Sequence, residues 1–144
     1  SRAQLVTILW RQAGSPVVNY LVDFNDVDED QWYTEAVRWA ASEGIVLGVS
    51  DTQFAPNQSI TREQFAAILY RYAQYKDMDV DGSANLSGYA DANNISEYAV
   101  PSIQWACGAS IINGTDGNRL DPQGYASRAE AATMLMRFCQ FESH

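Results

Sequence analysis

The sequence lacks several features that define common functional classes. Its 144 residues contain one histidine, two cysteines and four prolines, and 9 basic residues stand against 18 acidic ones. No run approaches the roughly 20 apolar residues that span a bilayer. No Lys/Arg cluster offsets the net charge of −9, so the field of the protein repels nucleic acid and anionic lipid at long range. We therefore expect neither nucleic acid nor a membrane as a partner.

The scarcity of histidine and cysteine also limits the catalytic chemistry. His144 is terminal, which argues against a histidine triad. Neither Cys107 nor Cys139 has a basic or histidine neighbour in the sequence that would mark a nucleophile. Whether the two cysteines form a disulfide depends on a Cα separation that the sequence does not give. We predict no catalytic residue, no metal site and no cofactor.

What the chain does contain is an internal repeat. Three motifs each open an apolar run that ends in a second arginine: Ser1-Arg2-Ala3-Gln4, Thr61-Arg62-Glu63-Gln64 and Ser127-Arg128-Ala129-Glu130. The apolar face of one repeat is buried only by stacking on its copies. We divide a single module over 1–144 into a partial repeat at 1–23, a full repeat at 24–76, a linker at 77–88 and a full repeat at 89–144. Because Ser1 falls inside a motif, we expect the chain to be a fragment of a longer protein.

Each motif is typical of a helix start. Ser1, Thr61 and Ser127 are N-capping residues, and the Gln or Glu three positions later completes a reciprocal capping box. Apolar residues then recur at helical spacing, as Leu5, Ile8 and Leu9, as Phe65, Ile68, Leu69 and Tyr72, and as Ala131, Met134, Leu135 and Phe138. We predict three amphipathic helices whose apolar stripes meet in a central three-helix bundle.

A second type of helix precedes the motif in each full repeat. Its first copy has a broad apolar face made of Trp32, Ala36, Val37, Trp39 and Ala40. Asp30 is its predicted N-cap, and Gly44 is its predicted left-handed end. In the second copy Pro101 must lie in or near the first turn, and Ser110 replaces Gly44. The sequence therefore predicts an all-α protein with about five principal helices.

The remaining segments are predicted to be connections. The first connector (45–60) and the second connector (111–126) are rich in Gly, Asp, Asn and Pro, so we expect turns there. The linker at 77–88 carries alternating aspartates like a calcium loop, but Gly88 stands where such a loop needs a bidentate carboxylate. We interpret it as a solvent-exposed crossover.

The arginines at the helix starts are the candidate binding residues. Arg2, Arg62 and Arg128 each follow a capping residue, where the helix dipole opposes a cation by about 0.3–1 kcal/mol. A helix start with free amides, together with a guanidinium that grips a carboxylate through two hydrogen bonds, is a site for a small anion. For Arg62 or Arg128 the alternative is a salt bridge to Asp26, Asp91 or a connector acid of a neighbouring repeat. The sequence leaves both interpretations open.

The two full copies share a longer pattern. The first contains Phe24-x-Asp26-Val27, Trp32-Tyr33, Ala36-Val37-x-Trp39-Ala40, Gly44-Ile45-Val46-x-Gly48, Phe54-x-Pro56 and Ile60-Thr61-Arg62-Glu63-Gln64. The second contains Tyr89, Asp91, Trp105-Ala106, Ile111-Ile112-x-Gly114, Leu120-x-Pro122 and Ser127-Arg128-Ala129-Glu130. This pattern closely resembles the S-layer homology (SLH) module over nearly the whole chain.

The resemblance implies a fold and a function. Members of that family typically carry three repeats in a pseudo-threefold arrangement, with the motif helices in the centre and shorter helices at the periphery. Their usual role is the non-covalent anchoring of surface proteins to secondary cell-wall polysaccharide of Gram-positive bacteria. The ligand is often a pyruvylated sugar held in grooves between repeats. The resemblance therefore implies an extracellular, cell-wall-associated module that binds an anionic carbohydrate and is not an enzyme.

The same resemblance implies which residues contact the ligand. They are Arg2, Arg62 and Arg128, and further Gly48, Gly114, Trp39, Trp105, Asp26 and Asp91. Packing in the core is the alternative role for the two tryptophans. A second hypothesis for the function is an assembly module, in which the parent surface protein or a partner chain completes the truncated first repeat. A third, an enzyme acting on glycans, requires catalytic residues outside this sequence.

Overall fold

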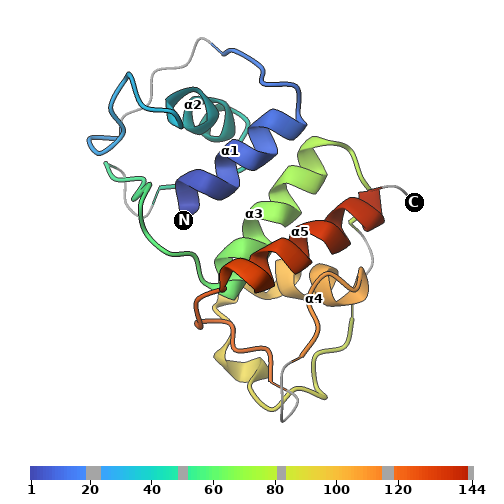
Figure 1. Ribbon diagram of the computed structural model, residues 1–144. Coiled ribbons are helices and arrows are strands. Elements are labelled where there is room, and N and C mark those ends of the chain that lie inside the picture. Colours follow the sequence, from blue (N-terminus) through green and yellow to red (C-terminus); the bar gives the residue numbers. More distant parts are fainter. Residues whose placement is uncertain (19–23, 49–51, 81–83, 115–118, 143–144) are drawn as a thin grey trace. The chain divides into compact units, whose positions relative to one another are not determined.

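The protein is helical throughout the part that the structure describes. The computed structural model describes residues 1–18, 24–48, 52–80, 84–114 and 119–142. Within these ranges the chain forms five α-helices and two short 3-10 helices, with a single isolated β-bridge (Figure 1). The predicted all-α fold is confirmed for these residues. The described residues divide into two units, 1–59 and 60–144. The pseudo-threefold bundle would combine helices of both units, so it stays a prediction, as do the repeat boundaries.

Unit 1 consists of α1 (Arg2–Gln12) packed against α2 (Thr34–Ser42). Its core contains Leu5 and Leu9 from α1, and Val37 and Trp39 from α2. The pairing follows from sequence spacing, because each helix places its apolar residues on one side. The predicted stripe of α1 is only partly buried, since Ile8 is 44% exposed.

The start of α2 differs from the prediction. The helix begins at Thr34, and its N-cap residue makes no side-chain capping bond, so the expected cap by Asp30 is wrong. Instead, the Thr34 hydroxyl donates to the Asp28 carbonyl (2.5 Å) and accepts from the Gln31 amide (3.0 Å). These bonds hold a turn where the sequence pattern predicts helix. Trp32 therefore lies before the helix and is 57% exposed.

Unit 2 is built around α3 (Arg62–Tyr75). The 3-10 helices η1 (Ala92–Asn94) and η2 (Glu97–Ala99) lead into α4 (Val100–Gly108), and η2 and α4 both pack against α3. Proline lies in the first turn of α4, as predicted. The last helix is α5 (Arg128–Glu142).

Aromatic side chains join the three long helices of unit 2. The ring of Phe138 from α5 lies 5.8 Å from Tyr72 of α3 and 6.3 Å from Trp105 of α4, measured between centroids. Cys107 and Cys139 lie on α4 and α5 as thiols, so the disulfide that the sequence left open does not form. The Cys107 thiol is partly buried, and this desolvation raises its pKa although a hydrogen bond with Tyr89 opposes the shift.

Four helices end in the same way. After α2, the Gly44 amide bonds to the Ala41 carbonyl and the Ile45 amide bonds to the Ala40 carbonyl. This pair of hydrogen bonds is the Schellman motif, which requires one residue in the left-handed backbone conformation. The left-handed residues after α1, α2, α3 and α4 are Gly14, Gly44, Asp77 and Ser110, with φ of 93°, 71°, 56° and 61°. The predicted end at Gly44 is confirmed, and Ser110 adopts the same conformation despite its side chain.

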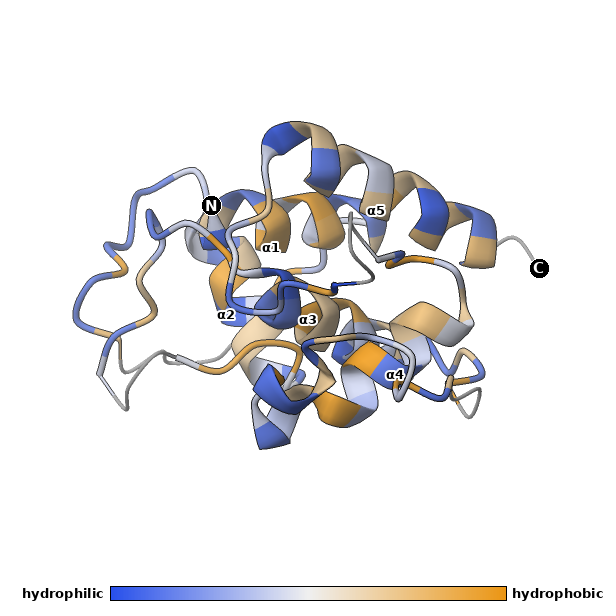
Figure 2. Ribbon diagram, turned by 90° about the horizontal axis from the view of Figure 1, so that it is seen from below, coloured by the Kyte–Doolittle hydropathy of each residue, from blue (hydrophilic) through white to orange (hydrophobic). Residues whose placement is uncertain are grey.

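The helix α5 is less covered than its two counterparts. Of its 15 residues only Met134 and Phe138 are buried, whereas α3 buries eight of its 14. Figure 2 shows hydrophilic and hydrophobic residues alternating along the α5 ribbon. The apolar residues of α5 are thus only partly buried within the described structure.

Candidate functional site

All three motif helices begin at the expected arginine. The helices start at Arg2, Arg62 and Arg128. The capping residue before each arginine accepts a hydrogen bond from the amide three positions later, and the Gln or Glu there bonds back to the capping residue. The three predicted capping boxes are confirmed. Each of these arginines is therefore the first residue of its helix, at the positive end of the helix dipole.

The first amides of α1 and α3 are occupied by the connectors. In α1, Arg2 N–H donates to the Gln58 carbonyl (3.1 Å) and Ala3 N–H to the Pro56 carbonyl (3.0 Å). In α3 the same pattern recurs, because Arg62 N–H donates to Gly124 and Glu63 N–H to Pro122, both at 3.0 Å. The expectation that these helix starts leave amides free for an anion is wrong for α1 and α3. Each connector supplies the acceptors that a helix start lacks.

Arg2 lies inside unit 1. It is 5% exposed, and its Nε and Nη2 donate to the carbonyls of Phe54 and Leu47, both at 2.8 Å. Its guanidinium also stacks 4.8 Å from the centroid of the Phe54 ring, a cation–π contact. Arg2 thereby fastens the first connector to the start of α1.

Arg62 is held by two carboxylates. Its Nε donates to Glu130 Oε2 (2.9 Å), its Nη2 pairs with the same oxygen, and its Nη1 donates to Asp121 Oδ2 (3.0 Å). The salt-bridge alternative is thus confirmed for Arg62, with a connector acid and the capping Glu as partners. The bonds from Arg62 and from Ser127 outweigh burial and lower the pKa of Glu130. The Glu130 carboxylate therefore has two roles, because it completes the capping box of α5 and pairs with the charge of Arg62.

Gly124 permits this close approach. A Cβ atom at position 124 would overlap the Asp121 carboxylate and the Arg62 guanidinium. Its carbonyl also accepts the Arg62 amide, and Thr61 and Tyr125 form an antiparallel β-bridge beside it. The second connector consequently runs directly across the start of α3.

Arg128 has a different environment. Its side chain is exposed, and within the described ranges the amides of Arg128 and Ala129 bond to no carbonyl. The segment before it is also open, since Tyr125 is 62% exposed. The start of α5 thus has the same capping box as α1 and α3 without a connector across it.

Asp26 and Asp91 shape the connectors. The Asp26 carboxylate accepts the Phe54 and Ala55 amides at 2.9 and 2.7 Å. Asp91 accepts the Leu120 and Asp121 amides, both at 2.8 Å. Burial opposes ionisation of Asp91, but these two backbone bonds prevail and lower its pKa. In both copies the second amide belongs to a residue with positive φ, 61° at Ala55 and 49° at Asp121, so each carboxylate stabilises a strained turn.

The remaining predicted residues are two core tryptophans and two glycines outside the core. Trp39 and Trp105 are 1% and 2% exposed, which agrees with the packing alternative. Gly48 is partly buried and follows Leu47, the residue that accepts from Arg2. Gly114 faces Tyr89, and an added Cβ would come within 2.8 Å of that ring. A small residue is therefore required at position 114 for the ring to pack.

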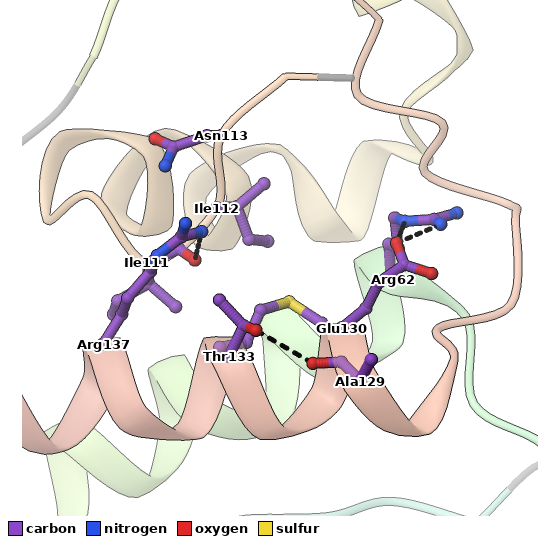
Figure 3. Close-up of a pocket in the computed structure, with 9 residues that line it drawn as sticks. Arg62, Ile111, Ile112, Asn113, Ala129, Glu130, Thr133 and Arg137 are labelled. Atoms are coloured by element: carbon purple, nitrogen blue, oxygen red, sulfur yellow. Dashed lines mark hydrogen bonds and ion pairs between the residues drawn. The ribbon is translucent and has the colours of Figure 1, made fainter. Parts of the chain in front are cut away.

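Unit 2 contains a pocket beside α5. Its volume is about 220 Å³, and it is lined by Arg62, Ile111, Ile112, Asn113, Ala129, Glu130, Thr133, Met134 and Arg137. Figure 3 shows Arg137 and Asn113 towards one end of the pocket and the Arg62–Glu130 pair at the other. Within the described residues Arg137 makes one hydrogen bond, a long one of 3.5 Å from Nη1 to the Ile111 carbonyl. The remaining N–H groups of that guanidinium suit a carboxylate.

Sequence reasoning missed several residues of this site. The sequence motif places Glu130 only in the capping box. It indicates no binding role for Arg137, because the helix dipole alone favours a cation towards the C-terminus of a helix. Trp32 is 57% exposed, although the pattern placed it on an apolar helix face.

In the described ranges no three His, Cys, Asp or Glu side chains are grouped to hold a metal ion. Part of the calcium-like linker, at residues 81–83, and His144 lie outside those ranges. None of the helices in these ranges has the length and apolar character to cross a membrane.

Comparison with known proteins gives a family match. The sequence model of the S-layer homology domain matches residues 23–66 and 88–132. The surface-layer 125 kDa protein of Lysinibacillus sphaericus is 33% identical over 119 residues, covering 81% of this chain and 10% of that protein.

Two other relatives have different names, and each contains a segment similar to most of this chain. An amylopullulanase of Thermoanaerobacterium thermosulfurigenes is 32% identical over 139 residues, covering 94% of this chain and 7% of the enzyme. A cellulosome-anchoring protein of Acetivibrio thermocellus is 24% identical over 119 residues, covering 83% of this chain and 26% of that protein. The chain thus spans only a small part of the length of the curated relatives it matches.

Proposed function

Because the chain belongs to the S-layer homology family, we propose that it is a non-catalytic module that holds a larger bacterial surface protein on cell-wall polysaccharide without a covalent bond. The module works outside the cell, on the wall of a Gram-positive-type bacterium. Similar segments occur in a surface-layer protein, a cellulosome-anchoring protein and an amylopullulanase. A common attachment role explains why one small segment accompanies such different proteins.

The pocket beside α5 is the observation that carries the proposal of a ligand. Pockets for whole small molecules usually measure about 300–1,000 Å³. A volume of about 220 Å³ suits one acidic substituent of a sugar rather than an oligosaccharide chain. The pyruvyl group of a pyruvylated cell-wall polymer is such a substituent, with one carboxylate and a small apolar methyl group.

The residues around the pocket match these two features. Arg137 provides guanidinium N–H groups for the carboxylate, and Asn113 provides an amide beside it. Ile112 and Met134 provide the apolar wall. Arg62 is already paired with Glu130 and Asp121, so Arg137 is the guanidinium that we assign to the carboxylate. We keep Arg128 as a further ligand contact, and the roles of Arg2, the glycines, the tryptophans and the aspartates in binding stay predictions.

The test is retention on purified cell-wall polysaccharide with and without its pyruvyl groups. We expect Arg137→Gln to lose about tenfold or more in affinity, since a hydrogen bond between two charged groups contributes about 1.5–3 kcal/mol. Removal of the pyruvyl groups should reduce wild-type binding to the level of the variant. Equal binding by wild type and Arg137→Gln would refute the site.

Arg11 offers a matched control. It holds the equivalent position in α1, lies in the last turn of that helix and is exposed. Arg11→Gln removes the same charge from the same repeat position without touching the pocket. It should bind like the wild type, and an equal loss with both variants would indicate a general effect of charge.

A second candidate function is assembly with another polypeptide segment. The uncovered start of α5 favours it, because the equivalent surfaces of α1 and α3 are both covered. Arg137 takes part only in the first function, whereas Arg128 takes part in both.

A further inference from the structure

One asparagine of the chain is followed by glycine, and this asparagine lines the pocket beside α5. Asn113 precedes Gly114, whereas every other asparagine in the sequence precedes a residue with a side chain. Asn113 lies towards the same end of the pocket as Arg137 (Figure 3). An asparagine followed by glycine loses its side-chain amide more readily than other asparagines, because glycine leaves the attacking backbone nitrogen unobstructed and its backbone adaptable.

The local structure leaves both reacting groups accessible. Asn113 and Gly114 are exposed and lie outside the helices. Among the described residues, neither the side-chain amide of Asn113 nor the backbone amide of Gly114 makes a hydrogen bond. Solvent therefore reaches both groups, and no hydrogen bond of the described structure has to break before they react.

The first repeat shows which of the two residues the fold requires. Gly114 lies so close to the Tyr89 ring that an added Cβ would come within 2.8 Å of it. Its counterpart in the first repeat is Gly48, so both copies keep the glycine. The residue before that glycine varies, and in the first copy it is Leu47, which is 62% exposed. The fold thus requires the glycine but not the asparagine, and only the second copy has the reactive pair.

We propose that Asn113 is a deamidation site whose product pairs with Arg137 and closes the pocket to an anionic ligand. The Gly114 nitrogen attacks the side-chain carbonyl carbon of Asn113, the new C–N bond closes a succinimide ring, and ammonia leaves with the proton from that nitrogen. Water then opens the ring at one of its two carbonyls and releases a proton, which leaves aspartate or isoaspartate at position 113. The reaction consumes one water, releases one ammonia and turns a neutral amide into a carboxylate.

The new carboxylate has a partner in the same pocket. Among the described residues the Arg137 guanidinium makes one long hydrogen bond, of 3.5 Å to the Ile111 carbonyl, so its other N–H groups suit a carboxylate. A carboxylate attached at position 113 acts at a high effective concentration and competes with one on a sugar. This step rests on the proposed function, in which Arg137 binds the ligand's carboxylate. Deamidation therefore weakens attachment to the wall as the protein ages, without an enzyme.

Peptide mapping by mass spectrometry measures the chemical step. The folded chain is incubated in mildly alkaline buffer, and conversion of Asn113 is compared with that of Asn57 and Asn93, which are also exposed. Asn113 should be converted at least about tenfold faster, because only its neighbour is glycine. Asn113→Gln should resist conversion, since the longer side chain must close a larger ring. Equal rates at the three asparagines would overturn the proposal, whatever the chain binds.

The binding step is tested with the aged protein and with Asn113→Asp, which installs one product directly. Both should bind pyruvylated polysaccharide about tenfold more weakly than fresh wild type, since the ligand loses a charged hydrogen bond at Arg137. Asn113→Leu carries the residue of the first copy and removes the amide without adding a charge, so it should bind more strongly than Asn113→Asp. Asn113→Gln should keep the same affinity before and after incubation, which controls for other damage.

Unchanged affinity in Asn113→Asp and in the aged wild type, while Arg137→Gln binds weakly, would overturn this proposal and leave the proposed function intact. A measurement without ligand separates the two further. In the isotope-labelled chain the Arg137 Nε–H resonance should shift as Asn113 is converted, while that of Arg11 should not. Conversion without this shift would refute the pairing with Arg137. Conversion with the shift, but with equal binding by wild type and Arg137→Gln, would support the deamidation and its pairing and refute the proposed function.

Discussion

Ser110 ends α4 in a conformation that suits glycine. Its φ is 61°, and its counterpart Gly44 ends α2 at 71°. A side chain in the left-handed region costs about 1 kcal/mol or more, because Cβ crowds the backbone. Ser110→Gly should therefore stabilise unit 2 by about 0.5–1 kcal/mol after the added freedom of the unfolded chain is included. Urea unfolding at constant protein concentration measures the change.

A neighbouring position provides the control. Ala109 is the C-cap residue of α4 and has a φ of −86°, which any residue adopts. Ala109→Gly gains no relief of strain and only increases the freedom of the unfolded chain, so it should destabilise by about 0.5–1 kcal/mol. Similar effects of the two substitutions would show that the backbone conformation at 110 is not strained.

Glu130 combines two roles that a single substitution separates. Glutamine at this position keeps the reciprocal cap, as Gln4 and Gln64 do in the other copies, but removes the ion pair with Arg62. The pair is partly exposed, so we expect Glu130→Gln to cost about 0.5–1 kcal/mol at pH 7.

The pH dependence of this cost has a definite sign. The hydrogen bond from Arg62 lowers the pKa of Glu130 in the folded state, so the ionised group stabilises the fold above its ordinary pKa of 4.5. This stabilisation is lost as the pH falls through the lowered pKa of the folded state, so the difference between wild type and Glu130→Gln should disappear on acidification below that pKa. Glu29→Gln, at an exposed site, serves as the control and should show little effect at any pH. A difference that persists undiminished at low pH would contradict the ion-pair account.

At the scale of elements, each motif helix depends on the connector that crosses its start. Asp91 fixes the second connector through the Leu120 and Asp121 amides, and that connector caps α3. Asp91→Ala should destabilise unit 2 by about 1–3 kcal/mol, because two amides lose a charged acceptor. Hydrogen exchange should accelerate at these two amides and at the first amides of α3.

The first repeat provides the internal comparison. Asp26→Ala should accelerate exchange at the Phe54 and Ala55 amides and at the start of α1, while the amides of unit 2 keep their protection. The two variants should thus give complementary patterns. Unchanged exchange at both helix starts would show that the connectors do not need the aspartates.

Local sequence was sufficient for most element boundaries. The capping boxes and the left-handed end at Gly44 are decided within a few residues, so they were predictable. The start of α2 was not, because the Thr34 hydroxyl bonds to Asp28 and to Gln31 and favours a turn that periodicity does not reveal. Periodicity accordingly placed Trp32 in a helix that begins two residues later.

At the scale of the whole molecule, the net charge of −9 limits how the proposed ligand is bound. Long-range forces repel an anionic polymer, while the proposed contacts between the ligand and Arg137 act at short range, at a side chain that is partly shielded from solvent. We expect affinity for the pyruvylated polymer to change less than about tenfold between 50 and 500 mM NaCl, unlike that of a basic protein on a polyanion. Binding isotherms at several salt concentrations measure it. A decrease of more than about a hundredfold would indicate mainly ionic attraction.

The sequence by itself determined the repeat, the all-α class, the helix starts and the position of an arginine at each start, because these depend on short-range patterns that recur along the chain. It did not determine what each arginine does. Only the tertiary structure decided that Arg2 is buried, that Arg62 pairs with Glu130 and Asp121, and that Arg128 is exposed. The physical reason is that the partners of Arg2 and Arg62 lie far away in the sequence, in the connectors and in α5, and the three helix starts differ in whether a connector crosses them.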